Sequence, residues 1–164
     1  MAGHNNAVGN TAFLKTQYTA NKSMGEKLVG SEFKLTIAGN ENLSILIRTA
    51  QFPERTREDV EDYGPMGMKY NQHGPLRNSG EMPCQCVETI RGDMLAFIVN
   101  AVNNKSYFDI TVESTPESLG GVAPDALSVN LFDCKIYVDG TDLSTEDVTA
   151  LVRPNLRIVY NFIE

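Results

Sequence analysis

A strict alternation at the end of the sequence restricts the fold of this chain more than any other feature. Four apolar residues lie two apart there, namely Leu156, Ile158, Tyr160 and Phe162. Side chains two residues apart share one face of a β-strand, so the pattern predicts a strand over residues 155–163 with one buried face. Chain ends are usually loose and polar unless other elements hold them. We therefore expect these residues to belong to the core of a β-sheet.

Shorter stretches with the same alternation predict further strands. They cover residues 32–37, 43–49, 84–90, 106–114 and 127–138. The turn sequence AGNEN separates the first two stretches, so we expect them to pair with each other as a hairpin. In the stretch 106–114, the side chains of Phe108, Ile110 and Val112 should face the core.

One segment has the periodicity of a helix. Gly92 opens the sequence GDMLAFIVNAVNNK, in which Leu95, Ile98, Val99 and Val102 would share one apolar face. A single helix among several strands predicts a β-rich α+β fold. We expect an antiparallel β-sandwich or barrel with one packed α-helix.

The domain organisation follows from where the periodicity is lost. A length of 164 residues, 41% of them hydrophobic and 21% charged, fits one globular domain. Residues 1–31 are small and polar with weak periodicity, so we expect an extended N-terminal arm, with local order only over 11–18. Residues 32–164 form the single β domain. Within it, residues 51–82 are dense in proline, glycine and charge, which predicts a long loop with a short strand near 68–71.

Charge and cysteine content restrict the classes of partner. The chain has 14 basic and 21 acidic residues, a formal net charge of −7, whereas nucleic-acid binding by phosphate neutralisation needs a basic surface. Three cysteines without a secretory signal argue against a disulfide framework. The sequence has neither a signal-peptide pattern nor a stretch that could span a bilayer, so we expect a protein made and folded in a cytoplasm, without a membrane anchor.

Residues that could carry catalysis are few. The two histidines are His4, in the arm, and His73, in the long loop. A pair of His73 with Cys84 or Cys86 is conceivable, and Cys134 would complete four zinc ligands. C-x-C on a strand with no second close pair is a weak zinc pattern, however, and buried structural cysteines explain it better. We therefore predict no catalytic residue, no metal and no cofactor.

The acidic segment DGTDLSTED, residues 139–147, does not have the spacing of a calcium loop. Ser144, with Asp147 three residues later, instead predicts the N-terminal cap of a short helical turn.

Three segments carry a resemblance to a known superfamily. LSILIRTAQFPERTREDVEDYGP is a strand that ends in proline and runs into an acidic loop with a terminal glycine. ETIRGDMLAFIVNAV has the place of the strand and helix that follow that loop, and LFDCKIYVDGTDLSTEDVTALVRPNLRIVYNFIE is similar to a closing pair of strands. In this order the chain resembles the tube-forming proteins of contractile bacteriophage tails, a superfamily that includes the hemolysin-coregulated protein of type VI secretion.

The resemblance implies a structural protein of the virion tail, made in the cytoplasm of a host bacterium. Six copies would form a ring whose sheets join into one inner barrel, and rings would stack into a tube that conducts viral DNA without binding it specifically. Tail sheath protein, tape measure protein and baseplate proteins would be its partners. The arm and the loop 51–82 would contact the next ring or subunit. The loop residues expected in that contact are Arg55, Arg57, Glu58, Asp59, Glu61, Asp62 and Tyr63.

Two alternatives stay open at the level of the sequence. The first is a tube-like component of the baseplate or neck, such as a tube initiator, with the same fold. The second is a small β-barrel binding module whose long loop covers a pocket. The mass of the assembled protein separates both tube-like interpretations from the binding module.

Overall fold

The computed structural model describes residues 8–164, and the chain divides into two compact units, Met1–Gly30 and Ser31–Glu164. The described part of the first unit contains helix α1 (Thr11–Ser23), in which every residue is exposed. Its first turn is capped by the side chain of Asn10, whose Oδ1 accepts the Phe13 N–H at 3.0 Å. The helix covers the stretch 11–18 for which the sequence indicates local order and continues beyond it. The expected position of His4 lies outside the described residues.

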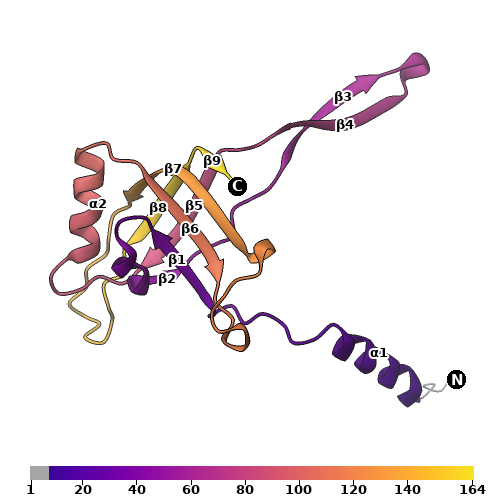
Figure 1. The fold of residues 1–164 in the computed structure, drawn as a ribbon, viewed down its shortest axis with the longest axis horizontal. Coiled ribbons are helices and arrows are strands. Elements are labelled where there is room, and N and C mark those ends of the chain that lie inside the picture. Colours follow the sequence, from indigo (N-terminus) through magenta and orange to yellow (C-terminus); the bar gives the residue numbers. More distant parts are fainter. Residues whose placement is uncertain (1–7) are drawn as a thin grey trace, which may run out of the picture. The chain divides into compact units, whose positions relative to one another are not determined.

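The second unit is built on an antiparallel sheet of seven strands that bends into a nearly closed barrel (Figure 1). The strands are β1 (Phe33–Ile37), β2 (Ile47–Thr49), β5 (Gly80–Cys86), β6 (Phe108–Ser114), β7 (Ser128–Val138), β8 (Asn155–Tyr160) and β9 (Phe162–Ile163). Their order is β1-β6-β7-β8-β5-β2, and β9 also pairs with β7. The prediction of a β-rich fold with an antiparallel barrel-like sheet is confirmed.

Helix α2 (Asp93–Asn103) packs its side chains into the same core as the strands. The core-facing positions of β6 agree with the sequence, because Ile110 and Val112 are buried and Phe108 packs at the margin. The predicted face of α2 is partly wrong. Its buried residues are Met94, Ile98 and Ala101, whereas Val99 and Val102 are 50% and 44% exposed. Both faces of this helix are apolar, so periodicity alone could not decide which one faces the barrel.

The predicted hairpin of the first two strands is wrong. Strand β1 pairs with β6 along its whole length, from Phe33 opposite Ser114 to Ile37 opposite Ile110, and β2 pairs with β5. Between them runs a 3₁₀ helix, η1 (Glu41–Leu46). It places Leu43 in the core and leaves Ile45 exposed, so the alternation over 43–49 did not reflect one continuous strand.

Two further local predictions are wrong, one in its boundaries and one in the type of structure. Strand β5 begins at Gly80 and ends at Cys86, whereas the sequence indicated a strand over 84–90. Gly80 is required at its start, because a Cβ there would lie 2.6 Å from the Tyr160 hydroxyl oxygen. No helical turn forms after Ser144, whose Oγ accepts the Glu146 N–H at 3.2 Å as part of an irregular turn.

The segment 51–82, expected as a loop, contains an extended hairpin. Strand β3 (Arg57–Tyr63) pairs with β4 (Lys69–Leu76), and a short 3₁₀ turn, η2 (Pro65–Gly67), connects them. Figure 1 shows this hairpin projecting from the seven-stranded sheet. All residues of β3 are exposed. Charged side chains on both faces of β3 removed the alternation on which strand prediction depends.

The closing strand is present, but its inward face changes at Asn161. Leu156, Ile158 and Tyr160 are buried as predicted, whereas Phe162 is 47% exposed and Ile163 is buried instead. Opposite Asn161, Asp133 has a left-handed backbone with φ +52° and forms a bulge in β7. The Asn161 N–H and its Nδ2 donate to the carbonyl oxygens of Phe132 and Asp133 at 3.2 and 2.9 Å. Both strands therefore shift their alternation at the same point.

Candidate assembly interface

The seven-stranded sheet has two open edges, one at β1 and one at β2. On β1, the carbonyl of Glu32 accepts the Thr115 N–H and the Ala38 N–H donates to Asp109, both at 2.9 Å. In an antiparallel ladder, successive residues turn their backbone groups to opposite sides. The N–H and C=O groups of Phe33 and Leu35 therefore point away from β6, and none of the described strands pairs with them. An open edge of this kind can pair with a strand of another chain.

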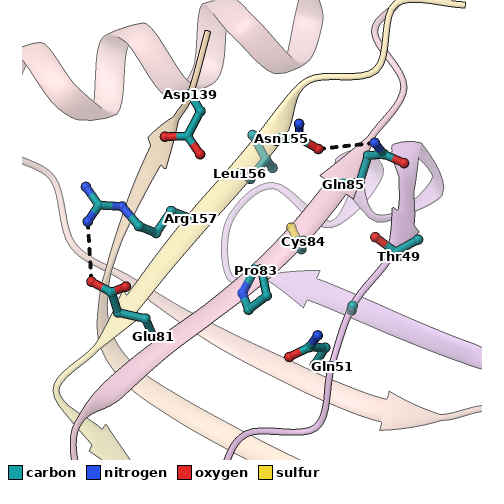
Figure 2. Close-up of a pocket in the computed structure, with 11 residues that line it drawn as sticks. Thr49, Gln51, Glu81, Pro83, Cys84, Gln85, Asp139, Asn155, Leu156 and Arg157 are labelled. Atoms are coloured by element: carbon teal, nitrogen blue, oxygen red, sulfur yellow. Dashed lines mark hydrogen bonds and ion pairs between the residues drawn. The ribbon is translucent and has the colours of Figure 1, made fainter. Parts of the chain in front are cut away.

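A shallow polar groove of about 760 Å³ lies beside the β2 edge, across the outward side of β5 and β8 (Figure 2). Four of its polar side chains pair with each other. Gln85 Nε2 donates to Asn155 Oδ1 at 3.1 Å, and Arg157 Nη1 lies 3.3 Å from Glu81 Oε1. The groove therefore carries one hydrogen-bonded pair and one ion pair rather than a set of convergent reactive groups.

The cysteines lie in the core, and their environment suppresses nucleophilic chemistry. Burial raises the pKa of the Cys84 thiol to about 12, and the neighbouring Cys86 adds to the shift. Burial likewise raises the pKa of Cys86 to about 11, with a contribution from Glu88, and that of Cys134 to about 12, with one from Asp109. A thiol with such a pKa remains protonated at neutral pH, and the thiolate is the reactive form.

The structure separates the residues that the sequence offered as zinc ligands. His73 lies on β4 of the exposed hairpin, opposite Asp59, while the three cysteines are buried in the barrel. Among residues 8–164, no group of three or more histidine, cysteine, aspartate or glutamate side chains could hold a metal ion.

The loop residues predicted to contact another subunit fall mainly on one strand of the hairpin. Six of them form most of β3, and Arg55 precedes it. Arg55 holds the base of the hairpin, because its Nη2 donates to the Glu164 carbonyl oxygen at 2.8 Å.

Some of the charges on β3 are neutralised within the hairpin or at its base. Lys69 pairs with Glu61, and Arg77 Nε lies 3.4 Å from Glu58 Oε1. Arg57 donates to the Gly74 carbonyl oxygen at 3.2 Å. Asp59, Asp62 and Tyr63 remain available on the exposed surface.

Comparisons with known proteins show which solved structures have a similar fold. No family model and no curated protein matches the chain. Among solved structures, a chain of the sheath–tube complex of an extracellular contractile injection system, PVC, in the extended state superposes with a TM-score of 0.67 at 12% identity. This match covers 89% of this chain and 95% of that one. The fold is that of contractile-injection-system components.

Three further solved structures have a similar fold. A chain of the PVC sheath/tube terminator gives a TM-score of 0.69 at 12% identity and covers 85% of this chain and 96% of that one. A chain of the cap that terminates the tube of the anti-feeding prophage gives 0.63 at 13% identity, with 85% and 90% covered. A chain of the anti-feeding prophage baseplate gives 0.62 at 12% identity, with 86% and 96% covered.

In the part of the chain that the structure describes, no helix has the length and hydrophobicity needed to cross a bilayer. The resemblance implied that the segment 51–82 contacts another subunit, and no pattern in the sequence indicated the open edges. Whether a strand lies at an edge depends on pairing between distant segments, such as β1 with β6.

Proposed function

We propose that this protein is a structural subunit that assembles into six-membered rings, and that these rings stack into the inner tube of a contractile tail. The observation that carries the proposal is a nearly closed antiparallel sheet with two open edges, in a fold shared along almost its whole length with components of sheath–tube complexes. Pairing between the edges of adjacent copies would remove the exposed backbone groups of β1 and β2.

The projecting hairpin supports the stacking of rings. A hairpin with no buried residue on β3 gains little stability from its own chain, because an isolated two-stranded ribbon is at best marginally stable in water. Contact with a second copy would bury its apolar side chains. A contact between two different patches of the same chain is heterologous and extends into a ring or a filament.

The charge of the chain is compatible with a tube that conducts DNA. A net charge of −7 disfavours binding of phosphates, so a strand of DNA would pass without being held. In this role the partners are tail sheath protein, tape measure protein and baseplate proteins, and the protein is a non-enzymatic component of a virion tail.

A second candidate is a terminator, cap or baseplate component built on the same fold. Chains from a sheath/tube terminator, a tube-terminating cap and a baseplate superpose as well as one from the sheath–tube complex itself. Such a component forms a single ring, whereas a tube protein forms long stacks. Electron microscopy of the concentrated protein distinguishes them, and a strictly monomeric protein at all concentrations and salt conditions contradicts both.

A pair of variants at the β1 edge tests the pairing of sheets. Phe33 is the first residue of β1, a position that tolerates proline, and its N–H points away from β6. We expect Phe33→Pro to reduce the assembled fraction in analytical ultracentrifugation far more than Phe33→Ala. Both variants remove the phenyl ring, but only the proline removes the N–H. Equal assembly of the two variants would show that the β1 edge does not pair between copies.

A further inference from the structure

The β3–β4 hairpin has two chemically different faces. The register places Glu61, Tyr63 and Lys69 on one face, which contains the ion pair of Lys69 with Glu61. The other face, here called the apolar face, carries Val60, Asp62, Met68, Tyr70 and the polar Gln72, since Asp62 lies opposite Tyr70, Val60 lies opposite Gln72 and the Gly64 N–H donates to the Met68 carbonyl. Met68 and Tyr70 are 74% and 63% exposed, an unusual exposure for large side chains on one small ribbon.

One carboxylate on the apolar face has no partner. Among residues 8–164, Asp62 forms neither a salt bridge nor a side-chain hydrogen bond, whereas the neighbouring Glu61 pairs with Lys69. The apolar face therefore combines exposed methionine and tyrosine side chains with one free negative charge. A surface that fits it would be an apolar hollow with a basic rim.

The barrel carries such a hollow at the C-terminal end of α2. A pocket of about 260 Å³ is formed by that end of the helix, by the start of the following segment and by the second half of β7. Its lining is Ala101, Val102, Lys105, Ser106, Tyr107, Lys135, Ile136 and Tyr137. It includes two lysines and no acidic residue. In the described part of the chain, neither lysine takes part in an ion pair.

The position of Lys105 is conformationally unfavourable for a lysine. The Ser106 N–H donates to the Ala101 carbonyl at 3.0 Å, which ends α2 in a Schellman-type motif with Lys105 in the left-handed region at φ +54°. Glycine usually occupies this position, because other residues meet steric strain there. Lysine at this site lowers the stability of the subunit and places an ammonium group at the margin of the pocket.

From these two surfaces we infer that the apolar face of the β3–β4 hairpin docks into the pocket at the end of α2 on a second copy of this chain. Met68 and Tyr70 cover the apolar lining, and Asp62 pairs with Lys105 at its margin. Methionine suits this contact because its flexible side chain fills irregular gaps. The inference rests on the proposed function, since it names the two surfaces through which copies in stacked rings join.

The two surfaces lie on different elements of the same unit. Figure 1 shows α2 on one side of the barrel and the hairpin projecting from the other, so the hairpin does not reach the pocket of its own chain. Docking between copies is then heterologous and leaves a free hairpin and a free pocket at the ends of every pair. Repetition of the contact produces a ring or a stack.

Disulfide trapping between two variants tests the contact directly. Met68→Cys is mixed with Val102→Cys and incubated with oxidised glutathione, which accepts the electrons as the intermolecular disulfide forms. The three native thiols are buried and do not compete. We expect a covalent dimer whose linked peptides contain positions 68 and 102. As a control, Met68→Cys is mixed with Leu143→Cys, at a site that is 79% exposed against 44% for Val102, so random collision would favour the control.

Charge reversal gives an independent readout. Asp62→Lys and Lys105→Glu should each raise the concentration needed for half-assembly by roughly tenfold or more, and the double variant should recover at least part of that loss. Asp59→Lys, an equal charge change on the same strand but on the opposite face, should have a much smaller effect. Lys105→Gly should raise the melting temperature by about 2–4 °C, as relief of backbone strain predicts, and yet weaken assembly.

The outcomes separate this inference from the proposed function. Rings or tubes that form without a 68–102 disulfide, or without rescue in the double variant, overturn the docking contact and leave the proposed function intact. A protein that never assembles overturns both. A strong 68–102 signal with recovery in the double variant supports the contact.

Discussion

At the scale of single residues, two buried side-chain oxygen atoms within residues 8–164 lack a hydrogen-bond partner, Asn78 Oδ1 and Ser114 Oγ, and Ser114 is the fully buried residue of the two. Ser114 is 1% exposed, and its hydroxyl has no hydrogen-bond partner within residues 8–164. A buried hydroxyl without a partner loses its hydration and gains nothing in return. Its neighbours on β6 at the same face, Ile110 and Val112, are fully apolar.

We expect Ser114→Ala to stabilise the protein by about 1 kcal/mol, since it removes the unsatisfied hydroxyl and leaves only a small cavity. Urea denaturation of the isolated subunit measures the change in free energy of unfolding. Ser114→Val serves as the control for packing, because it fills the site with more volume. A destabilised Ser114→Ala variant would mean that the hydroxyl has a partner after all.

The cysteines predict a loss of stability at alkaline pH. Burial raises the pKa of Cys84 and Cys134 to about 12 in the folded state, above the ordinary thiol value of about 9. Below pH 9 both states keep the protons, so these thiols contribute no pH dependence there. Between about pH 9 and 12 the unfolded state releases protons that the folded state retains, and the free energy of unfolding falls. Thermal melts from pH 8 to 11 should show this decline, and it should be weaker in a Cys84→Ala/Cys134→Ala variant.

At the scale of elements, the bulge in β7 at Asp133 decides which side chains of the closing strand face the core. At Asp133 in β7 and at Asn161 in the closing strand, the side chains that face the core change from one set of alternate positions to the other. Beyond it, Ile163 lies opposite Leu131 in the core, while Phe162 lies on the outside opposite Phe132 with ring centroids 6.2 Å apart.

This arrangement predicts that Ile163 contributes more to stability than Phe162. The alternation in the sequence predicts the reverse order. Ile163→Ala should destabilise the isolated subunit by about 2–3 kcal/mol, because it leaves a cavity in the core. Phe162→Ala, although it removes a larger side chain, should cost less than about 1.5 kcal/mol, since that ring is half exposed and its main contact is one aromatic pair. Equilibrium unfolding in urea compares the two. A larger effect of Phe162→Ala would contradict the change of face at Asn161.

At the scale of the whole molecule, folding and assembly depend on different parts of the second unit. The core is formed by the seven-stranded sheet and α2, and the residues in its main cluster come from neither β3 nor β4. The hairpin adds exposed surface and no buried residue of β3. Stability of the subunit and its association should therefore respond separately to mutation.

Replacement of Arg57–Leu76 by a short glycine–serine linker should leave the far-ultraviolet circular dichroism and the melting temperature of the barrel nearly unchanged. The same variant should lose the contacts through which rings stack, so sedimentation velocity should show a large drop in the fraction of long assemblies. The matched control is a variant of the Leu143 loop of similar exposure, which should assemble normally. Normal assembly of the hairpin-less chain would place the contacts elsewhere.

Local patterns in the amino-acid sequence were enough to predict the class of the fold and most of its elements. Alternation in the segments of β6, β7 and β8 identified three strands, since each has one buried face and side chains of period two. Helical periodicity after Gly92 predicted α2. The buried side chains Leu156, Ile158 and Tyr160 followed directly, because burial of one face of a strand is a local property.

Tertiary structure decided everything that depends on which segments meet. The pairing of β1 with β6 rather than with β2 joins residues about 80 apart, and no local pattern encodes it. The hairpin of β3 and β4 is exposed, so its residues carry no alternation to read. The outward turn of Phe162 arises from the bulge at Asp133, on another strand. Local chemistry sets what each segment can form, whereas edges, bulges and docking surfaces exist only once distant segments have paired.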